Sequence, residues 1–146
     1  MKLVEFLVSK ISYYHSNKSY AVVLNEINGD RRLPIMLGSY EAQAIAIAIE
    51  SIDTQRPLTH DLLINALQGL GLSLKNVTIN RCEEEIFFST INIVSPSLVE
   101  KNIDSRPSDA IILALKLHCP IFVNELLLDN INNCLLYTSD AADESV

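Results

Sequence analysis

The chain has 146 residues, a formal net charge of −7, a hydrophobic fraction of 49% and a charged fraction of 20%. This composition is typical of one globular domain and excludes an intrinsically disordered protein. No apolar run is long enough to span a membrane and the N-terminus shows no secretory cleavage signal, so we expect a cytoplasmic protein without a membrane segment. The acidic balance argues against binding of nucleic acid through a broad basic surface.

The N-terminal part of the sequence predicts an antiparallel meander of three strands. Residues 2–9 alternate as a half-buried strand does, and residues 20–24 form a second apolar run. Asn28-Gly29-Asp30 is a strong turn signal before residues 31–37. Because Pro34 cannot donate a hydrogen bond to a neighbouring strand, we expect the third strand to lie at a sheet edge or to carry a bulge.

The remaining sequence predicts helices and strands in alternation. The helix at 41–50 is apolar nearly all round, which fits burial on two sides or a contact between subunits of a homo-oligomer. Strands that come both before and after helices indicate an α+β fold, with a mainly antiparallel sheet and three to four helices in a single domain. The other expected elements are helices at 59–70, 108–117 and 125–131, and strands at 74–82, 86–94, 98–103 and 121–123.

The C-terminal residues 134–146 differ in kind from the rest. From Cys134 to Glu144 the sequence is identical to the translation of a common transposase sequencing adapter, a match of eleven residues that chance does not explain. We therefore interpret residues 134–146 as a non-native tail and residues 1–133 as the domain. On this interpretation the native chain continues beyond Asn133 with a sequence that the tail has replaced.

Two segments of the sequence are similar to each other. The first reads Ile-Asp-Thr-Gln-Arg-Pro-Leu-Thr-His-Asp from Ile52 to Asp61, and the second reads Ile-Asp-Ser-Arg-Pro-Ser-Asp from Ile103 to Asp109. Each contains an acid, an Arg-Pro pair, a hydroxyl residue and a second acid at the start of a predicted helix. If the segments meet in the fold, they bring four carboxylates, two guanidinium groups and one imidazole together.

Part of this pattern is expected from helix capping alone. Thr59 and Ser108 stand where an N-cap residue belongs, and Asp61 and Asp109 stand in the first helical turn. A carboxylate there gains about 0.3–1 kcal/mol from the helix dipole. Capping does not require an arginine before the cap, nor a further acid before the arginine.

Three roles remain open for the residues that capping does not explain. Arg56 and Arg106 could pair with Asp53 and Asp104 as structural clamps. They could instead bind a phosphate group, assisted by the amides of the helix N-termini. In the third role, carboxylates hold a divalent metal, as in two-metal hydrolysis of phosphodiesters; the candidate ligands are Asp61, Asp104, Asp109, His60 and Glu41.

Three blocks of the sequence resemble the bifunctional nuclease (DNase/RNase) domain family. They are the stretch from Arg32 to Ala46, the stretch from Arg56 to Leu62 and the stretch from Asp104 to Ile111, in order and at family-like spacing. The resemblance implies an α+β domain that is usually oligomeric and acts on DNA and RNA. Bacterial relatives often carry a C-terminal helical hairpin shared with repair proteins, which the tail would have replaced here.

The leading hypothesis is a nuclease that hydrolyses phosphodiester bonds of DNA and RNA with the help of Mg²⁺ or Mn²⁺. The expected catalytic residues are His60, Asp61, Asp104 and Asp109. The expected substrate-binding residues are Arg56, Arg106, Thr59 and Ser108, and the expected metal ligands are Asp61, Asp104, Asp109 and Glu41. The alternative is a non-enzymatic, oligomeric binding or regulatory module that recognises a protein partner or a small anionic ligand.

Overall fold

The computed structural model describes residues 2–129 and 143–145. The element order confirms the α+β class and all seven predicted strands. The elements are β1 (Leu3–Tyr14), β2 (Ser19–Glu26), β3 (Arg32–Leu37), α1 (Ser39–Ile49), α2 (Thr59–Gly69), β4 (Ser73–Glu83), β5 (Ile86–Val94), β6 (Glu100–Ser105), α3 (Pro107–Leu117), β7 (Ile121–Asn124), α4 (Glu125–Asp129) and β8 (Asp143–Ser145).

The strands form one sheet in the order β3-β2-β1-β7-β4-β5-β6, and β8 pairs with the end of β1. Two antiparallel meanders, β1-β2-β3 and β4-β5-β6, flank the short strand β7, which is antiparallel to β1 and parallel to β4. The expectation of a mainly antiparallel sheet is therefore confirmed. Pro34 lies in β3, which is an edge strand and pairs only with β2. The expected edge position of this proline is therefore confirmed.

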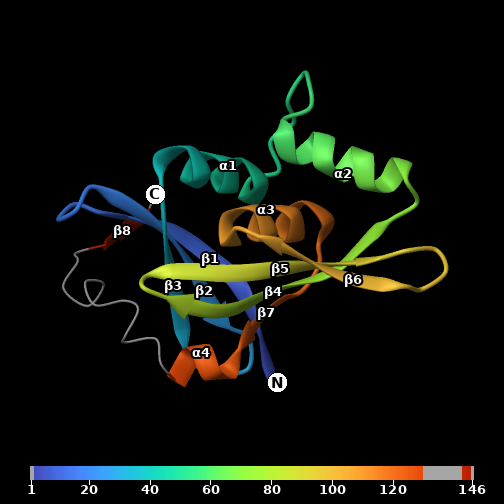
Figure 1. Ribbon diagram of the computed structural model, residues 1–146. Coiled ribbons are helices and arrows are strands. Elements are labelled where there is room, and N and C mark those ends of the chain that lie inside the picture. Colours follow the sequence, from blue (N-terminus) through green and yellow to red (C-terminus); the bar gives the residue numbers. More distant parts are fainter. Residues whose placement is uncertain (1, 130–142, 146) are drawn as a thin grey trace.

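Helices α1, α2 and α3 lie on one side of the sheet and α4 lies on the other (Figure 1). Helix α3 connects β6 to β7 and is the most deeply buried of the three, with Ile111, Ile112 and Leu113 at most 1% exposed. Helix α1 packs beside it through Ala42 and Ile45. These side chains meet the apolar face of the sheet in one core, so the N-termini of α1 and α3 are held in fixed positions.

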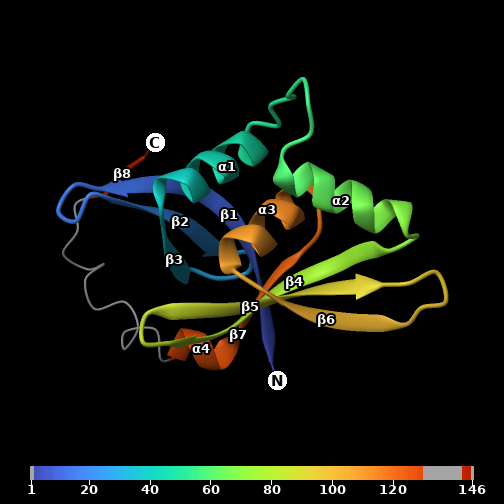
Figure 2. The same cartoon turned by 45° about the horizontal axis from the view of Figure 1, so that its top comes forward.

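Helix α2 is attached much more loosely than α1 or α3. It buries Ile64 against the core, whereas Leu62 and Leu70 are more than half exposed. The long connection from α1 to α2 projects away from the sheet (Figure 2). Helix α2 therefore covers the end of α3 without closing tightly over the sheet beneath it.

The N-cap residues of α2 and α3 differ from the prediction, although α2 begins at Thr59 as expected. The N-cap residues are Leu58 and Arg106, so the expectation that Thr59 and Ser108 cap these helices is wrong. In α3 the first helical position is taken by Pro107, whose fixed φ and missing N–H suit that position. The hydroxyl groups of Thr59 and Ser108 are thereby released from capping.

Several element boundaries also differ: strand β1 runs to Tyr14 and not to residue 9, and helix α1 begins at Ser39 and not at residue 41. Strand β6 begins at Glu100 and not at residue 98, because Leu98 has a φ of 65° within a turn. Helix α4 ends at Asp129, and the last two residues of the helix predicted at 125–131 lie outside the described residues. In the described part of the chain, no helix is long and apolar enough to cross a membrane.

Candidate active site

The two similar segments meet through their helix N-termini. The imidazole Nε2 of His60 lies 2.8 Å from Oδ1 of Asp109, although the residues are 49 positions apart in the sequence. The guanidinium group of Arg106 donates to the same carboxylate, from Nε to Oδ2 at 2.9 Å and from an Nη atom to Oδ1 at 3.3 Å. Asp109 therefore binds one side chain from each segment.

Helix α1 adds a third component to this arrangement. The Oγ atom of Ser108 donates to Oε2 of Glu41 at 3.0 Å, and Arg106 lies 3.7 Å from the same oxygen. Ser108 is 3% exposed, so this hydroxyl needs the acceptor that Glu41 provides. We call the set of five residues the inter-helix cluster: Glu41, His60, Arg106, Ser108 and Asp109.

Asp109 does not make the hydrogen bond to its own helix N-cap that the corresponding acids of the other two helices make. Glu41, Asp61 and Asp109 all stand at the third position of their helices. Glu41 and Asp61 accept a hydrogen bond from the backbone N–H of the residue that caps their own helix, at 2.9 Å in both cases. Asp109 uses its two oxygens on His60 and Arg106. Its side chain is thus committed to the contact between segments.

The charge state of Asp109 fixes the role of each nitrogen of His60. Partial burial raises the pKa of Asp109, but the hydrogen bonds from Arg106 and His60 outweigh it, and the net pKa lies below the ordinary value. An ionised carboxylate only accepts hydrogen bonds. The Nε2 atom of His60 must therefore carry a proton, which leaves Nδ1 of the neutral ring as its basic atom.

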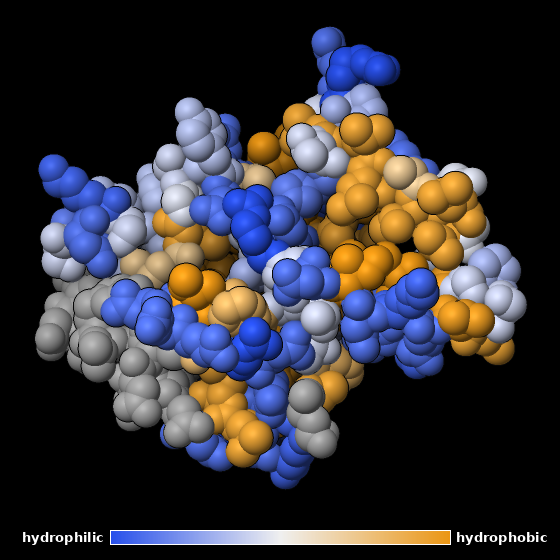
Figure 3. Space-filling view, in the orientation of Figure 1, coloured by the Kyte–Doolittle hydropathy of each residue, from blue (hydrophilic) through white to orange (hydrophobic). Residues whose placement is uncertain are grey.

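The inter-helix cluster forms the polar end of a cavity of about 780 Å³. Thr59, Asp104 and Tyr40 also line this end, and Tyr40 is 87% exposed at the rim. The rest of the cavity is apolar, and in Figure 3 apolar side chains gather around the hollow beneath α2. The apolar lining comes from α2, α3 and the sheet: Leu63, Leu67, Ile91, Ile93, Ile103, Ile112 and Leu113, with Ala44 from α1.

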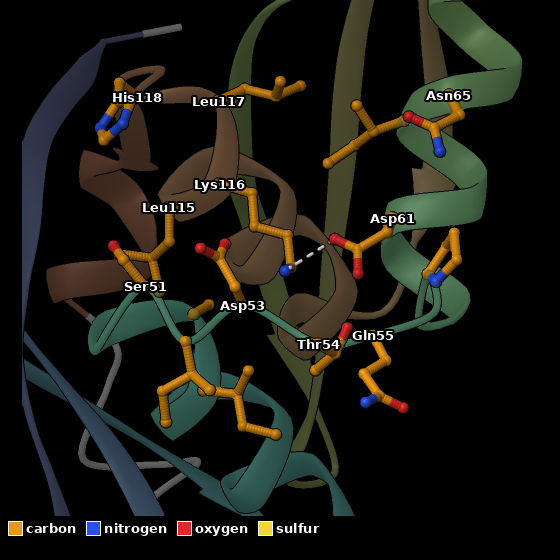
Figure 4. Close-up of a pocket in the computed structure, with 15 residues that line it drawn as sticks. Ser51, Asp53, Thr54, Gln55, Asp61, Asn65, Leu115, Lys116, Leu117 and His118 are labelled. Carbon is orange, nitrogen blue, oxygen red and sulfur yellow. Dashed lines mark hydrogen bonds and ion pairs between the residues drawn. The ribbon is translucent and has the colours of Figure 1, made fainter.

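Asp61 does not join the inter-helix cluster, although it is adjacent to His60. Successive residues of a helix point about 100° apart, so His60 and Asp61 face different sides of α2. The carboxylate of Asp61 accepts a hydrogen bond from Nζ of Lys116 at 2.8 Å, which together with the Leu58 amide lowers its pKa (Figure 4). It lines a second cavity of about 520 Å³, together with Asp53.

The clamp between each arginine and the acid before it, one of the three roles left open, does not form. Arg106 pairs with Asp109 and not with Asp104. Within the described residues, the side chains of Arg56, Asp53 and Asp104 make no hydrogen bond or ion pair, and Arg56 is exposed to solvent. The two similar segments thus have different structural roles, and Arg106 is the arginine that faces the cavity.

The predicted metal ligands do not converge in this arrangement. Asp61 faces the second cavity, and the carboxylates of Glu41 and Asp109 are both occupied by hydrogen-bond donors. Among the described residues, no three His, Cys, Asp or Glu side chains are grouped so that they could hold one ion. The predicted set therefore does not fit a ready-made site for Mg²⁺ or Mn²⁺, which demand several oxygen ligands around one point.

The sequence patterns did not point to two residues that the structure places near the predicted site residues. Lys116 binds Asp61 and lies seven positions after Asp109, a spacing that places both on one side of a helix; this spacing is the signal that could have found it. Tyr40 precedes Glu41 at the N-terminus of α1, and no sequence pattern singled it out. Both come near the predicted site only because three helices meet there.

Comparison with known protein families assigns most of the chain to a family. A family profile described as the bifunctional nuclease domain matches residues 22–134, which is most of the chain. The chain belongs to the bifunctional nuclease domain family. The matched range contains every residue of the inter-helix cluster.

Individual relatives are similar to about three quarters of the chain. Two uncharacterised proteins from two strains of Mycobacterium tuberculosis are 40% identical to the chain over 109 residues, which is 73% of this chain and 63% of theirs. Bifunctional nuclease 1 of Oryza sativa subsp. japonica is 26% identical over 114 residues, 34% of its length. The chain therefore spans less than two thirds of these relatives.

Proposed function

We propose that this protein is a nuclease that hydrolyses phosphodiester bonds of DNA and RNA at the inter-helix cluster. The observation that carries the proposal is the contact between His60 and Asp109, which joins two distant segments at the wall of an open cavity. Membership of the bifunctional nuclease domain family, with rice relatives that are named bifunctional nucleases, supports the reaction class.

In the proposed reaction His60 is the general base. Its Nδ1 atom takes a proton from water as the water oxygen attacks phosphorus, and the bond from phosphorus to the leaving oxygen breaks. The imidazolium then returns that proton to the leaving oxygen, so the products are an alcohol and a phosphate monoester. Asp109 holds the ring in the required tautomer and stabilises the imidazolium, as a buried carboxylate does for a catalytic histidine.

Arg106 is the residue that we propose to bind the phosphate. Its side chain is 68% exposed and retains N–H donors beyond those that bind Asp109. A planar guanidinium group suits two oxygens of one phosphate, and it neutralises the charge that develops on them. Thr59 lines the same end of the cavity and offers a hydroxyl donor.

The decisive experiment is cleavage of a labelled oligonucleotide by purified protein and its variants. We expect His60→Ala to lower the rate about 10²–10⁴-fold, because that is the usual contribution of general acid–base catalysis. Asp109→Asn lowers it as well, since the amide cannot hold the ring in the same tautomer. The matched control is His118→Asn, because His118 lines the other cavity and asparagine tolerates its left-handed backbone conformation.

A rate that is unchanged in His60→Ala, with the variant folded, would contradict the assignment. Assays with EDTA and with added Mg²⁺ or Mn²⁺ test the metal prediction separately. Because the carboxylates do not form a ready-made metal site, no step of the proposed reaction passes through a metal. Abolition of wild-type cleavage by EDTA, with rescue by Mn²⁺, would show that substrate brings the ion into the site.

A non-enzymatic binding module is the competing function. Arginine–acid clamps away from any cavity, Asp53 with Arg56 and Asp104 with Arg106, would favour this function. The structure forms neither clamp, and Arg106 lines the larger cavity. Both candidate functions are compatible with a homo-oligomer, which stays a prediction. Sedimentation of the purified protein measures it.

A further inference from the structure

Strand β6 is an open edge of the sheet (Figure 2). In the described part of the chain, no strand pairs with its outer side, and every residue of β6 except Ser105 is exposed. The opposite edge strand, β3, carries Pro34, which cannot donate a backbone hydrogen bond. Strand β6 contains no proline and pairs with β5 without a bulge. A regular open edge of this kind is a template on which another strand can pair.

The hairpin that joins β5 to β6 shows which backbone groups of β6 point outward. The N–H of Ser95 donates to the carbonyl of Val99 at 3.0 Å, so these two residues form a hydrogen-bonded pair. Hydrogen-bonded and non-hydrogen-bonded pairs alternate along an antiparallel ladder. The N–H and C=O groups of Glu100, Asn102 and Asp104 therefore point away from β5, toward the open side.

The side chains of β6 alternate between the two faces of the sheet. Ile103 is opposite the buried Ile91 of β5 and lines the larger cavity, and Lys101 lies on the same face. Asn102 and Asp104 project from the other face, so Asp104 borders the cavity through its backbone. Ile103 is 45% exposed, which leaves an apolar side chain at the open edge.

The charges of β6 restrict how two copies of this strand can pair with each other. A twofold axis between antiparallel copies places one residue opposite itself, because facing residues share a side of the sheet. An axis at Lys101 or at Asp104 sets like charges opposite each other, and an axis at Asn102 sets Glu100 opposite Asp104. An axis at Ile103 sets no like charges together, and it brings Asn102 opposite Asp104 of the second copy.

We propose that two copies of this chain form a dimer by antiparallel pairing of their β6 strands, with Ile103 on the twofold axis. About four backbone hydrogen bonds then join Asn102 of each copy to Asp104 of the other. The Asn102 amide also donates to the facing carboxylate. Ile103 of the second copy lies beside Ile103 and extends the apolar wall of the larger cavity, so both copies contribute to that cavity. The inference is independent of the proposed nuclease function.

A cysteine placed on the axis tests this pairing directly. Facing residues of a non-hydrogen-bonded pair have Cα atoms about 4.5 Å apart, a separation that a disulfide spans. We expect Ile103→Cys to yield a disulfide-linked dimer after mild oxidation, visible on a non-reducing gel. The matched control is Lys101→Cys on the same face, because two copies of that residue lie about 13 Å apart along the strands. Wild type is run in parallel because Cys119 is a free thiol.

A charge placed on the axis tests the same surface without an added thiol. Ile103→Lys sets two ammonium groups opposite each other, and we expect the dissociation constant of the dimer to rise at least about tenfold. The matched control is Ile86→Lys, because Ile86 is 59% exposed and lies in β5, away from the open edge. Sedimentation of both variants over a range of concentrations measures the change, and circular dichroism verifies that each is folded.

Three results would overturn the dimer: wild-type protein that sediments as a monomer at every concentration, crosslinking of Lys101→Cys as readily as of Ile103→Cys, or an unchanged dissociation constant in folded Ile103→Lys. Cleavage of oligonucleotides by a protein that stays monomeric would reject the dimer and leave the proposed function intact. A dimer that crosslinks at Ile103→Cys but cleaves no oligonucleotide would reject only the proposed function.

Discussion

Asp109 shows how one residue can be diverted from a helix-capping position into a contact between distant segments. Its lowered pKa has a direct consequence for acid stability. The ordinary value is 3.8, so the folded chain binds fewer protons than the unfolded chain around and below that pH. The stabilisation by Asp109 is therefore fully present above about pH 4 and is lost as the pH falls through the folded pKa.

We expect Asp109→Asn to be less stable than wild type by about 1–2 kcal/mol at pH 7, because it loses charged hydrogen bonds to His60 and Arg106. The difference should shrink below about pH 4, because the unfolded wild-type chain takes up a proton there that the folded carboxylate, with its lowered pKa, binds only at lower pH. Urea unfolding of both proteins between pH 3 and pH 7 measures this. A difference that is the same at pH 3 and pH 7 would show that the charge of Asp109 contributes nothing to stability.

Helix α2, which carries His60, buries fewer residues against the core than helix α3 does. It buries Ile64, whereas α3 buries six residues. The ion pair between Asp61 and Lys116, with side chains 30% and 18% exposed, adds to this attachment. We expect the amides of α2 to exchange with solvent faster than those of α3, since local opening follows the amount of buried contact.

Replacement of Lys116 by glutamine should accelerate exchange in α2 about fivefold, which corresponds to loss of about 1 kcal/mol. Hydrogen exchange followed by mass spectrometry measures it. The matched control is Lys75→Gln, because the pair of Lys75 and Glu100 is 56% and 47% exposed and such surface pairs contribute little. Equal acceleration in α3 would mean that Lys116 supports the whole domain and not α2 in particular.

The whole molecule is organised around one core between the sheet and helices α1 and α3. Ile111 is fully buried at its centre, and Leu126 is 66% exposed at the surface. Ile111→Ala should lower the free energy of unfolding by about 2–5 kcal/mol, because it removes buried carbon atoms and leaves a cavity. Leu126→Ala should change it by less than about 0.5 kcal/mol. Urea denaturation followed by circular dichroism compares the two.

Local signals in the sequence account for the elements and for the regions that contain the site. The turn at Asn28-Gly29-Asp30 and the alternation in the strands depend on neighbouring residues, so the meanders and their edge at Pro34 were predictable. The predicted start of α1 is two residues late and that of α3 one residue late, and the N-caps expected for α2 and α3 are wrong. The reason is that capping depends on backbone angles, and Pro107 sets those angles at α3 in place of Ser108.

The sequence by itself determined the α+β class, the order of the elements and the segments that carry His60 and Asp109. Only the tertiary structure decided that Asp109 binds His60 and Arg106, that Asp61 turns to Lys116, and that Asp104 stands without a partner among the described residues. The physical reason is the range of the forces. Backbone preferences act between residues close in the sequence, whereas the direction of a side chain at a helix start is set by packing of helices from distant parts of the chain.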